Sequence, residues 1–526
     1  MSKEKILSGK TYLGIELGST RIKAVLTDDE FHCIAIGAYD WENKLENGYW
    51  TYSLDEIHKG VKGCFANLVA DVAERYRTEL NCIGAIGISG MMHGYLAFDE
   101  NDNLLVPFRT WRNTTTEKAA NELTELFEFN IPQRGSIAHL YQAIVDDEPH
   151  VSKIVHITTL AGYIHFLLTG RRELGTGEAS GMFPIKCGNY DNDMISKFTK
   201  LVESKCYEWN ISDILPKVKQ AGAEGAYLTE SGAKFLDVTG KLKPGIPMCP
   251  PEGDAGTGMI ATNAVTPKTA NISAGTSIFA MTVLENSLKN LYREIDMVTT
   301  PDGSPVAMVH CNNCSGELDS WVKIFGEFAE LTGIKIDKSS VYESLYNNTI
   351  KADSDCGGLT AFNYLSGEHM TGIKNGSPMY FRNAKSNMNL ANFIKAQIYS
   401  AMATLTLGME ILFEKENVCI EQIQAHGGLF KVKGIAQQIL ADALNTNVAV
   451  TETAGEGGAW GMALLAAYMV NGKGIALGEW LLQNVFNNMA SVILNPEQNG
   501  ISGFREYMRR YKAALVAEKK LEEVLC

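Results

Sequence analysis

Apolar and polar positions alternate over three short segments at the start of the chain. TYLGIELGS, IKAVLTDD and HCIAIGAYDW each read as a strand, and glycine or charged residues separate them. Residues 53–76 instead carry apolar side chains at helical spacing, with Ser53 placed to cap the first turn. The apolar run CIGAIGISG over 82–90 predicts a buried strand. Strands that alternate with helices in this way predict an α/β domain.

The second half of the chain begins a similar cycle. Residues 269–285 read as strand, glycine and hydroxyl turn, strand, and the core ISAGTSIFAM loosely repeats IELGSTRIKAV. So short a repeat also arises by chance, but a duplication would place a cleft between two related halves. Residues 420–452 then read as strand, glycine turn, helix, strand. We predict two domains, residues 1–265 and 266–526, with a helical tail from about residue 474 that packs on the second domain.

Composition limits the class of protein. The chain has 526 residues, 45% of them apolar and 21% charged, which is typical of a globular protein with more than one core. Its net charge of −14 argues against nucleic acid as a partner. The longest apolar run, WGMALLAAYMV, is too short to cross a membrane, and the first residues lack a secretory signal. We therefore expect a cytoplasmic protein with small-molecule ligands.

The cysteines do not predict a disulfide framework or a metal site. There are 11 of them, scattered without regular spacing, so reduced thiols are expected. HCNNC, at 310–314, could mimic a metal or redox motif. A structural zinc needs a second pair of ligands at suitable spacing, and none follows. We expect these two thiols to have no function.

Two turns carry glycine next to hydroxyl side chains. One contains Gly18, Ser19 and Thr20, and the other contains Gly275 and Thr276. Such a turn offers several backbone N–H groups and hydroxyls to an anion, although each alone is also what an ordinary hairpin needs. The Walker phosphate-loop spacing is absent. As a pair that faces one cleft, the turns predict a polyphosphate site supplied from two sides.

Two further glycine-rich stretches are candidates for chemistry. In HGGLFK, Gly427 and Gly428 would let the backbone approach a flat ring or a ribose, or would serve only a strand-to-helix turn. In EGDAGTG, Asp254 stands between glycines, where a carboxylate can accept the proton of a substrate hydroxyl. An aspartate at this place also suits a helix cap.

These segments in this order resemble the FGGY family of carbohydrate kinases, over roughly residues 12–470. The motifs that carry the resemblance are GIELGSTRIKAVLTD, GISGMMHGYLAFD, GEASGMFPI, EGDAGTGMIATNAV, SAGTSIF, YLSGE, HGGLFK and GEGGAWGMALLAA. The resemblance implies an α/β, two-domain, actin-like ATPase fold of the ribonuclease H-like type, with a cleft between duplicated domains. It also implies phosphorylation of a sugar or polyol hydroxyl by ATP with Mg²⁺, and a homodimer.

The family pattern assigns roles to residues of this chain. Asp254 would be the general base, and Glu16 would lie near Mg²⁺ or its water shell. The remaining residues would bind the nucleotide. Contacts to the ATP phosphates are implied for Gly18, Ser19, Thr20, Gly275 and Thr276, and an adenosine pocket for Gly427 and Gly428 with Lys431 at its edge.

The resemblance also implies a sugar-binding site, formed by the motifs GMMHG and RTWRNTTT. GMMHG is similar to the GQMHG of xylulokinases, which implies that Met92 and a cleft-facing His93 contact the sugar. Trp111 and Asn113 would stack on the sugar and recognise its hydroxyls, with Asn113 favoured over Arg112.

The chain departs from the family pattern at several positions. Glu16 stands where relatives carry Asp, Met91 replaces a glutamine, and IPQRGSIAHLYQ matches the central signature poorly. These departures indicate a divergent branch of the family.

Three classes of function compete. The leading hypothesis is a kinase for a ketopentose such as xylulose or ribulose, or for another ketose or polyol. An actin-like ATPase switch that binds a protein partner would share the nucleotide motifs but would have no reason to carry GMMHG and EGDAG. A binding protein that has lost catalysis is suggested only by Glu16 and Met91.

Overall fold

The computed structural model describes residues 2–451, 457–487 and 489–525. The first half of the chain forms a mixed sheet in the order β13-β14-β6-β1-β2-β3, with β15 also paired to β6. β1 runs antiparallel to β2 and parallel to β6. The strands are β1 (Thr11–Leu17), β2 (Arg21–Asp28), β3 (Cys33–Asp40), β6 (Ala85–Gly90), β13 (Ala226–Tyr227), β14 (Pro247–Met248) and β15 (Glu252–Gly253).

Three helices cover one face of this sheet. They are α2 (Leu54–Tyr76), α5 (Leu160–Thr169) and α9 (Glu230–Leu236). The predicted cap of the first helix is confirmed, because Ser53 Oγ accepts the N–H of Glu56 at 3.2 Å. Gly37 of β3 allows close contact with α2, since a Cβ there would lie 2.2 Å from the carbonyl oxygen of Cys64. With its helices, this sheet is the N-terminal lobe.

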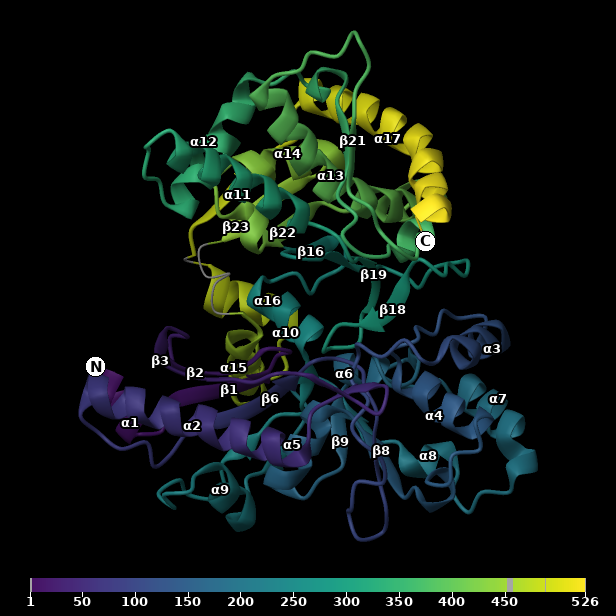
Figure 1. Cartoon of the computed structure of the whole chain (residues 1–526). Coiled ribbons are helices and arrows are strands. Elements are labelled where there is room, and N and C mark those ends of the chain that lie inside the picture. Colours follow the sequence, from purple (N-terminus) through teal and green to yellow (C-terminus); the bar gives the residue numbers. More distant parts are fainter. Residues whose placement is uncertain (1, 452–456, 488, 526) are drawn as a thin grey trace.

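A second group of helices extends the N-terminal lobe and encloses its own apolar core. The group consists of α3 (Glu117–Phe127), α4 (Ser136–Val145), α6 (Thr176–Ser180), α7 (Asn192–Val202) and α8 (Ile211–Ile214). Figure 1 shows these helices beside the sheet, on the side away from the N-terminus. Short strands form four two-stranded pairs in this lobe. The pairs are β4 (Lys44–Glu46) with β5 (Tyr49–Thr51), β7 (Leu96–Phe98) with β8 (His156–Thr158), β9 (Glu173–Gly175) with β12 (Lys217–Lys219), and β10 (Ile185–Lys186) with β11 (Asn189–Tyr190).

The second half of the chain forms another mixed sheet, in the order β18-β19-β17-β16-β22-β23-β24. β16 runs antiparallel to β17 and parallel to β22. The strands are β16 (Thr269–Ala274), β17 (Ile278–Val283), β18 (Asp296–Thr299), β19 (Pro305–Cys311), β22 (Gln422–His426), β23 (Asn447–Thr451) and β24 (Ser491–Leu494). A separate small sheet pairs β20 (Thr360–Phe362) with β21 (Met379–Phe381).

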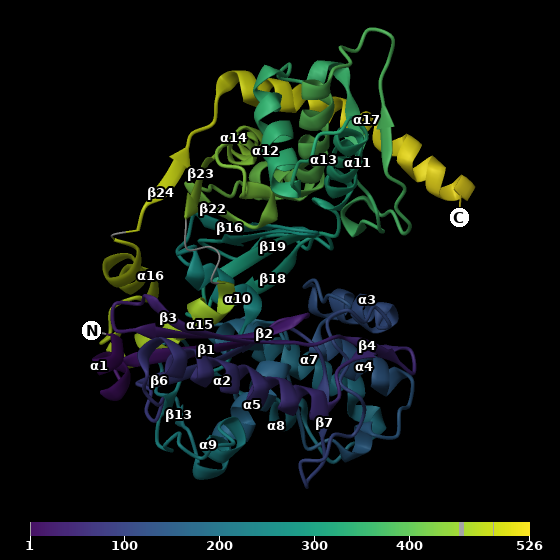
Figure 2. The same ribbon diagram turned by 60° about the vertical axis from the view of Figure 1, so that its left-hand side comes forward.

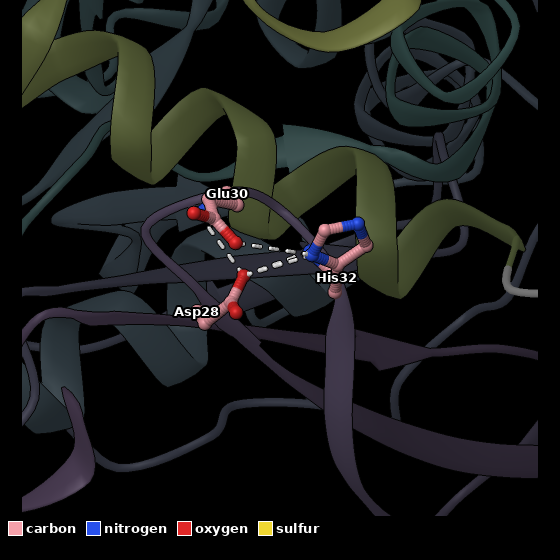
Figure 3. A group of neighbouring side chains, drawn as sticks. All are labelled: Asp28, Glu30 and His32. Carbon is pink, nitrogen blue, oxygen red and sulfur yellow. Dashed lines mark hydrogen bonds and ion pairs between the residues drawn. The ribbon is translucent and has the colours of Figure 1, made fainter. Parts of the chain in front are cut away.

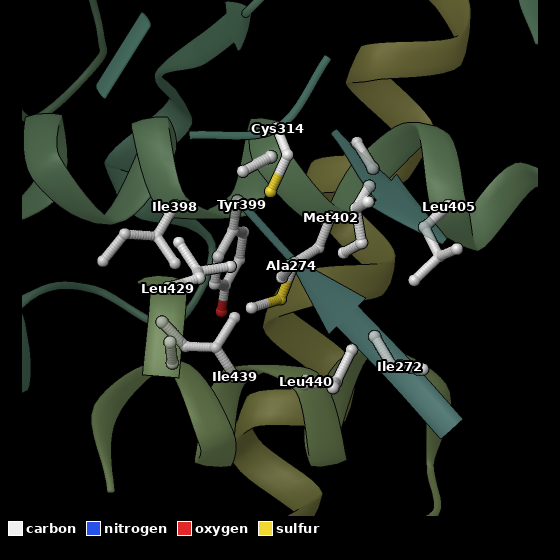
Figure 4. Close-up of a cluster of buried hydrophobic side chains, with 14 of the residues drawn as sticks. Ile272, Ala274, Cys314, Ile398, Tyr399, Met402, Leu405, Leu429, Ile439 and Leu440 are labelled. Atoms are coloured by element: carbon white, nitrogen blue, oxygen red, sulfur yellow. The ribbon is translucent and has the colours of Figure 1, made fainter. Parts of the chain in front are cut away.

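Helices cover the outer face of the second sheet and form the C-terminal lobe with it. They are α11 (Gly316–Leu331), α12 (Lys338–Asn348), α13 (Leu390–Glu410), α14 (Ile435–Leu444) and α17 (Gln498–Leu525). Figure 4 shows the core, where Tyr399 and Met402 of α13 lie between β16 and α14. The described cysteines are all free thiols, and Cys311 and Cys314 are buried in this core.

The predicted duplication is visible in the strand pairing. Each lobe has an antiparallel hairpin, β1 and β2 in one and β16 and β17 in the other, whose first strand continues into a parallel pair. IELGSTRIKAV and ISAGTSIFAM occupy corresponding hairpins. The two-domain α/β fold with a cleft between duplicated halves is therefore confirmed.

Three helices occupy the space between the lobes in both views of the molecule (Figures 1 and 2). They are α10 (Asp254–Ala261), α15 (Gly457–Asn471) and α16 (Leu477–Leu481). α15 lies within the predicted second domain, yet it packs on the first sheet beside β1. Glycines permit this approach: a Cβ on Gly14 would lie 1.9 Å from the carbonyl oxygen of Ala459, and one on Gly461 would lie 2.0 Å from that of Thr257.

The tail differs from the purely helical prediction. Residues 491–494 form β24, which pairs antiparallel with β23 at the edge of the second sheet. The β-branched residues of SVIL favour this extended pairing over a helix. α17 then packs on the C-terminal lobe as predicted, with Tyr507 and Tyr511 fully buried. No described helix has both the length and the apolar composition needed to cross a membrane.

Candidate active site

A cavity of about 430 Å³ lies between the two lobes. The N-terminal lobe contributes the end of β1, the following turn, the loop after β6 and the start of α10. The C-terminal lobe contributes β16, β17, β19 and β22. The lining of the cavity includes Glu16, Ser19, Met92, His93, Trp111, Arg134, Asp254, Asn271, Ser277, His310 and His426.

Asp254 is the first residue of α10 and faces this cavity. Its Oδ1 accepts the N–H groups of Met92 at 3.1 Å and of Ala255 at 2.9 Å. Burial raises the pKa of Asp254, and these backbone hydrogen bonds oppose the rise. The carboxylate is thus held in one orientation at the wall of the cavity, where it can accept a proton from a bound hydroxyl.

Glu16 lies near the end of β1, against the first turn of α15. Its Oε2 accepts the N–H of Ala459 at 3.1 Å, and a Cβ on Gly458 would lie 2.5 Å from Oε1. Burial, and then the charge of Asp254, raise the pKa of Glu16 to about 7. A carboxyl group whose ionisation is opposed by a second carboxylate in the same cavity is suited to a nearby cation, and Mg²⁺ prefers oxygen ligands.

The first hydroxyl-bearing turn joins β1 to β2. The indole N–H of Trp41 donates to the carbonyl oxygen of Gly18 at 2.7 Å, and the Tyr52 hydroxyl donates to that of Ser19. Ser19 Oγ lines the cavity and accepts the indole N–H of Trp111 at 3.2 Å. Thr20 is exposed.

The second turn joins β16 to β17 and is held in a similar way. The N–H groups of Cys314 and Ser315 donate to the carbonyl oxygens of Thr276 and Gly275, at 2.9 Å and 3.1 Å. Ser277 lines the cavity, whereas Thr276 is exposed. In both turns the carbonyl groups are therefore engaged by residues that do not line the cavity.

The predicted adenosine loop follows β22. Gly427 has φ 109°, and a Cβ there would lie 2.3 Å from the carbonyl oxygen of Ala274. Only glycine fits this place, and the loop is thereby held against the end of β16. Gly428 has open space around it, and Lys431 is exposed. These three residues are not part of the lining, but His426 just before them is.

His93 and Met92 follow β6, as predicted for the sugar side. His93 lines the cavity although it is only 5% exposed, and its Nδ1 lies 3.0 Å from the carbonyl oxygen of Gly181. Burial, together with the charge of Arg134, lowers the pKa of His93 to about 3. Because a carbonyl only accepts, Nδ1 carries the proton of the neutral ring, and Nε2 is left as an acceptor for a hydroxyl.

The structure separates the two residues predicted from RTWRNTTT. Trp111 lines the cavity, but Asn113 does not. The Asn113 amide is occupied by backbone groups: Oδ1 accepts the N–H of Trp50 at 2.8 Å, and Nδ2 donates to the carbonyl oxygens of Trp50 and Thr110, each at 2.9 Å. In this structure the Asn113 amide holds the loop that carries Trp111 and lies outside the cavity lining, and its predicted sugar contact stays a prediction.

Several residues of the site were missed by the sequence analysis. Arg134 comes from the segment that matched the family pattern poorly, and His310 comes from HCNNC, which was considered only as a metal or redox motif. Behind Asp254, the Glu252 carboxylate accepts the N–H groups of Gly177 at 3.2 Å and Glu178 at 2.9 Å. Burial raises the pKa of Glu252 to about 8. The glycines of GEASG and EGDAG are the sequence feature from which this close packing could have been predicted.

A second cluster of titratable groups, Asp28, Glu30 and His32, lies outside the cavity lining (Figure 3). Its carboxylates form ion pairs with Lys5 of α1 (Ser2–Leu7), whose Nζ lies 3.0 Å from Asp28, 2.7 Å from Asp29 and 3.2 Å from Glu30. The cluster therefore anchors the N-terminal helix, and we assign no metal to it.

Comparisons with known proteins identify the family of the chain. Two models of the FGGY family of carbohydrate kinases match the chain, the N-terminal domain over residues 11–260 and the C-terminal domain over residues 270–470. A xylulose kinase of Haemophilus influenzae is 24% identical over 488 residues, which cover 88% of this chain and 91% of that protein.

Solved structures share the fold. A ligand-bound xylulose kinase from Lactobacillus acidophilus superposes with a TM-score of 0.79 at 16% identity and covers 97% of this chain and 99% of its own. Glycerol kinase from Plasmodium falciparum with ADP has a TM-score of 0.76 at 14% identity, over 97% of this chain and 98% of its own.

Proposed function

Because the chain belongs to the FGGY family of carbohydrate kinases, which transfer phosphate from ATP to a sugar, we propose that its acceptor is a ketopentose such as xylulose or ribulose. The observation that carries the proposal is the cavity between the lobes, where Asp254, the GMMHG loop and both hydroxyl-bearing turns meet. The xylulose kinase of Haemophilus influenzae, similar along most of the chain, supports a ketopentose. Another ketose or a polyol is the alternative.

In this proposal Asp254 is the general base. The proton of the attacking hydroxyl passes to the Asp254 carboxylate, and the sugar oxygen forms a bond to the γ-phosphorus. The bond from that phosphorus to the β–γ bridging oxygen breaks, and ADP leaves. The hydrogen bonds from Met92 and Ala255 hold the carboxylate in place for this transfer. Most of the acceleration comes from position and charge neutralisation, so an ordinary carboxylate is sufficient.

The two turns would bind the ATP phosphates from opposite lobes. Gly18, Ser19 and Thr20 would approach from one side, with Gly275 and Thr276 from the other. Glu16 would hold Mg²⁺ directly or through water, and the cation would neutralise charge on the phosphate oxygens. Gly427 and Gly428 would lie against the adenosine, with Lys431 at the edge of its pocket.

The sugar would lie between His93 and Trp111, with Met92 beneath it. His93 Nε2 would accept a hydrogen bond from a sugar hydroxyl, because Nδ1 is committed to Gly181. The indole of Trp111 offers an apolar face to the carbon skeleton and is fixed by its bond to Ser19.

A panel of neutral acceptors tests the proposal. ADP release by the purified protein with Mg-ATP is measured against ketopentoses, ketohexoses and polyols, with ATP alone as the baseline. We expect the largest kcat/KM with a ketopentose. A polyol or hexose as the best acceptor would correct the substrate, and ATP hydrolysis that no acceptor stimulates would favour the ATPase switch instead.

A further inference from the structure

A second cavity, of about 480 Å³, adjoins the first and shares Trp111, Arg134 and His310 with it. It lies between the loop that follows Trp111, the α3 helix and the 130–134 segment of the N-terminal lobe, and the 293–296 and 310–312 segments of the C-terminal lobe. The family motifs used above do not account for this space.

The lining of the second cavity is cationic. Arg112, Arg134 and Arg293 face it, and Asp296 is the one carboxylate among its lining residues. Both Asp296 oxygens are already engaged, one by the Arg134 guanidinium and the other by Asn130 Nδ2 at 2.8 Å. In a chain with a net charge of −14, a cavity with this excess of guanidinium groups is unusual.

The other two guanidinium groups have little compensation. Arg112 stacks on Trp50 at 4.0 Å from the ring centroid and has no carboxylate partner in the described part of the chain. Arg293 donates to Asn121 Oδ1 at 2.7 Å and approaches the exposed Glu125 only at 3.5 Å. A guanidinium that stacks on an aromatic face or bonds a neutral amide keeps N–H groups for an anion.

Neutral imidazoles complete the wall. His310 lies next to His369, with ring centroids 6.0 Å apart and nearly parallel planes. Burial, and then the charge of Arg134, lower the pKa of His310 to about 3. An anion at this place would meet the N–H groups of Arg112 and Arg293 and a net positive charge, because the one lining carboxylate, Asp296, is already paired with Arg134 and Asn130.

We propose that the second cavity binds a small organic anion, through a carboxylate or phosphate group that Arg112, Arg134 and Arg293 hold beside the acceptor. The inference rests on the proposed function, because it takes the first cavity as the acceptor site. The anion has two possible sources. It is the acidic end of a sugar acid that reaches across the shared wall, or a separate ligand bound beside a neutral sugar.

Because Arg112 and Arg134 belong to the N-terminal lobe and Arg293 to the C-terminal lobe, a bound anion would bridge the lobes. It would therefore favour the closed arrangement that keeps water from the phosphoryl group.

Calorimetric titration of the full chain tests the proposal, with Mg²⁺ and a non-hydrolysable ATP analogue present so that the nucleotide phosphate site is filled. The probes are a six-carbon aldonate, the neutral polyol of the same length, and inorganic phosphate with and without a ketopentose. We expect the aldonate or the phosphate to bind at least tenfold more tightly than the polyol. The doubly substituted Arg112→Gln, Arg293→Gln protein should lose at least tenfold of that affinity, and the exposed Arg382→Gln should lose none.

The two sources give different results. An aldonate that is phosphorylated and competes with the ketopentose identifies the acid group of the acceptor. Phosphate that binds together with the ketopentose identifies a separate ligand. Anions that bind no more tightly than the polyol, or equal losses in the Arg382→Gln control, would overturn the proposal. Kinase turnover with neutral acceptors is measured in parallel, so the proposed function is tested separately.

Discussion

The two hydroxyl-bearing turns are built alike but differ in charge. Each ends the first strand of a hairpin, and in each the carbonyl groups are held by residues outside the cavity. At the position before the last residue of the strand, however, β1 carries Glu16 and β16 carries Ser273. The parallel neighbours of these two residues are Ser89 and His426, respectively.

Because of this difference, the two lobes contribute different kinds of side chain to the cavity. The N-terminal lobe brings both carboxylates to the cavity wall, whereas the C-terminal lobe brings neutral groups such as Asn271, Ser277 and His426. A polyphosphate with its cation would therefore place the cation toward the first lobe and phosphate oxygens toward the second. The two turns occupy corresponding places in the duplicated fold, and the acidic side chain of Glu16 gives them different charges.

Removing that acid should have the largest effect. Glu16→Gln keeps the shape of the side chain but makes the first turn as neutral as the second, so kcat should fall about 10³-fold, as for loss of a main electrostatic group. Ser273→Ala, at the matching strand position, should change kcat less than threefold. Steady-state kinetics at varied Mg²⁺ concentration measure kcat for both variants. Similar losses of kcat in the two variants would contradict the proposed difference in charge between the turns.

Glu16→Asp sharpens this comparison further, because it introduces the aspartate that the family resemblance predicts at this position. It should keep activity within about tenfold, since the carboxylate remains although its reach is one methylene shorter. A large gain in rate would instead mean that the native chain is impaired in catalysis.

The asymmetry should also appear in folding stability as a function of pH. The folded-state pKa of Glu16 is raised to about 7, so the neutral form is favoured in the folded protein. The contribution of Glu16 to the free energy of unfolding is fully present below pH 4.5 and is lost as the pH rises through 7. The total loss is about 3 kcal/mol, at ~1.4 kcal/mol per pKa unit. Relative to the wild type, Glu16→Gln should thus gain stability between pH 5 and 8 in urea unfolding, and Ser273→Ala should not. A constant difference across this range would contradict the buried environment of Glu16.

The smallest effect is expected at the start of the second turn, where Gly427 lies against Ala274. Gly427→Ala should cost about 2 kcal/mol of stability, because φ 109° and the 2.3 Å approach strain any side chain there, and should raise KM for ATP about tenfold. Gly428→Ala, in open space, should leave stability unchanged. An equal loss of stability in both variants would show that the strain argument is wrong.

Much of the fold could be predicted because it depends on local sequence patterns. The alternating strands around Gly18, the cap at Ser53 and the second hairpin each depend on residues close in sequence. α15 could not be placed in this way. WGMALLAAYMV is apolar on all sides, and a helix of that kind must be buried without indicating which sheet buries it.

The site was predictable where a motif fixes the backbone and not where side chains meet across the fold. Asp254 and His93 follow from glycine-rich loops at strand ends. Asn113 looked equally suited to a sugar, but its amide is taken up by the backbone of Trp50, 63 residues away in sequence. Arg134 and His310 reach the cavity only through the packing of the lobes.

Transfer of labelled phosphate in a single turnover tests the central claim most directly. Excess wild-type protein and excess Asp254→Asn are each mixed with γ-labelled ATP, Mg²⁺ and a ketopentose, and ATP affinity is measured in the same samples. We predict that the label appears on the sugar with the wild type, and at least 10³-fold more slowly with Asp254→Asn at unchanged ATP affinity, while Asp193→Asn at the surface behaves as the wild type. Label released only as inorganic phosphate, or a transfer rate for Asp254→Asn within tenfold of the wild type, would contradict the account.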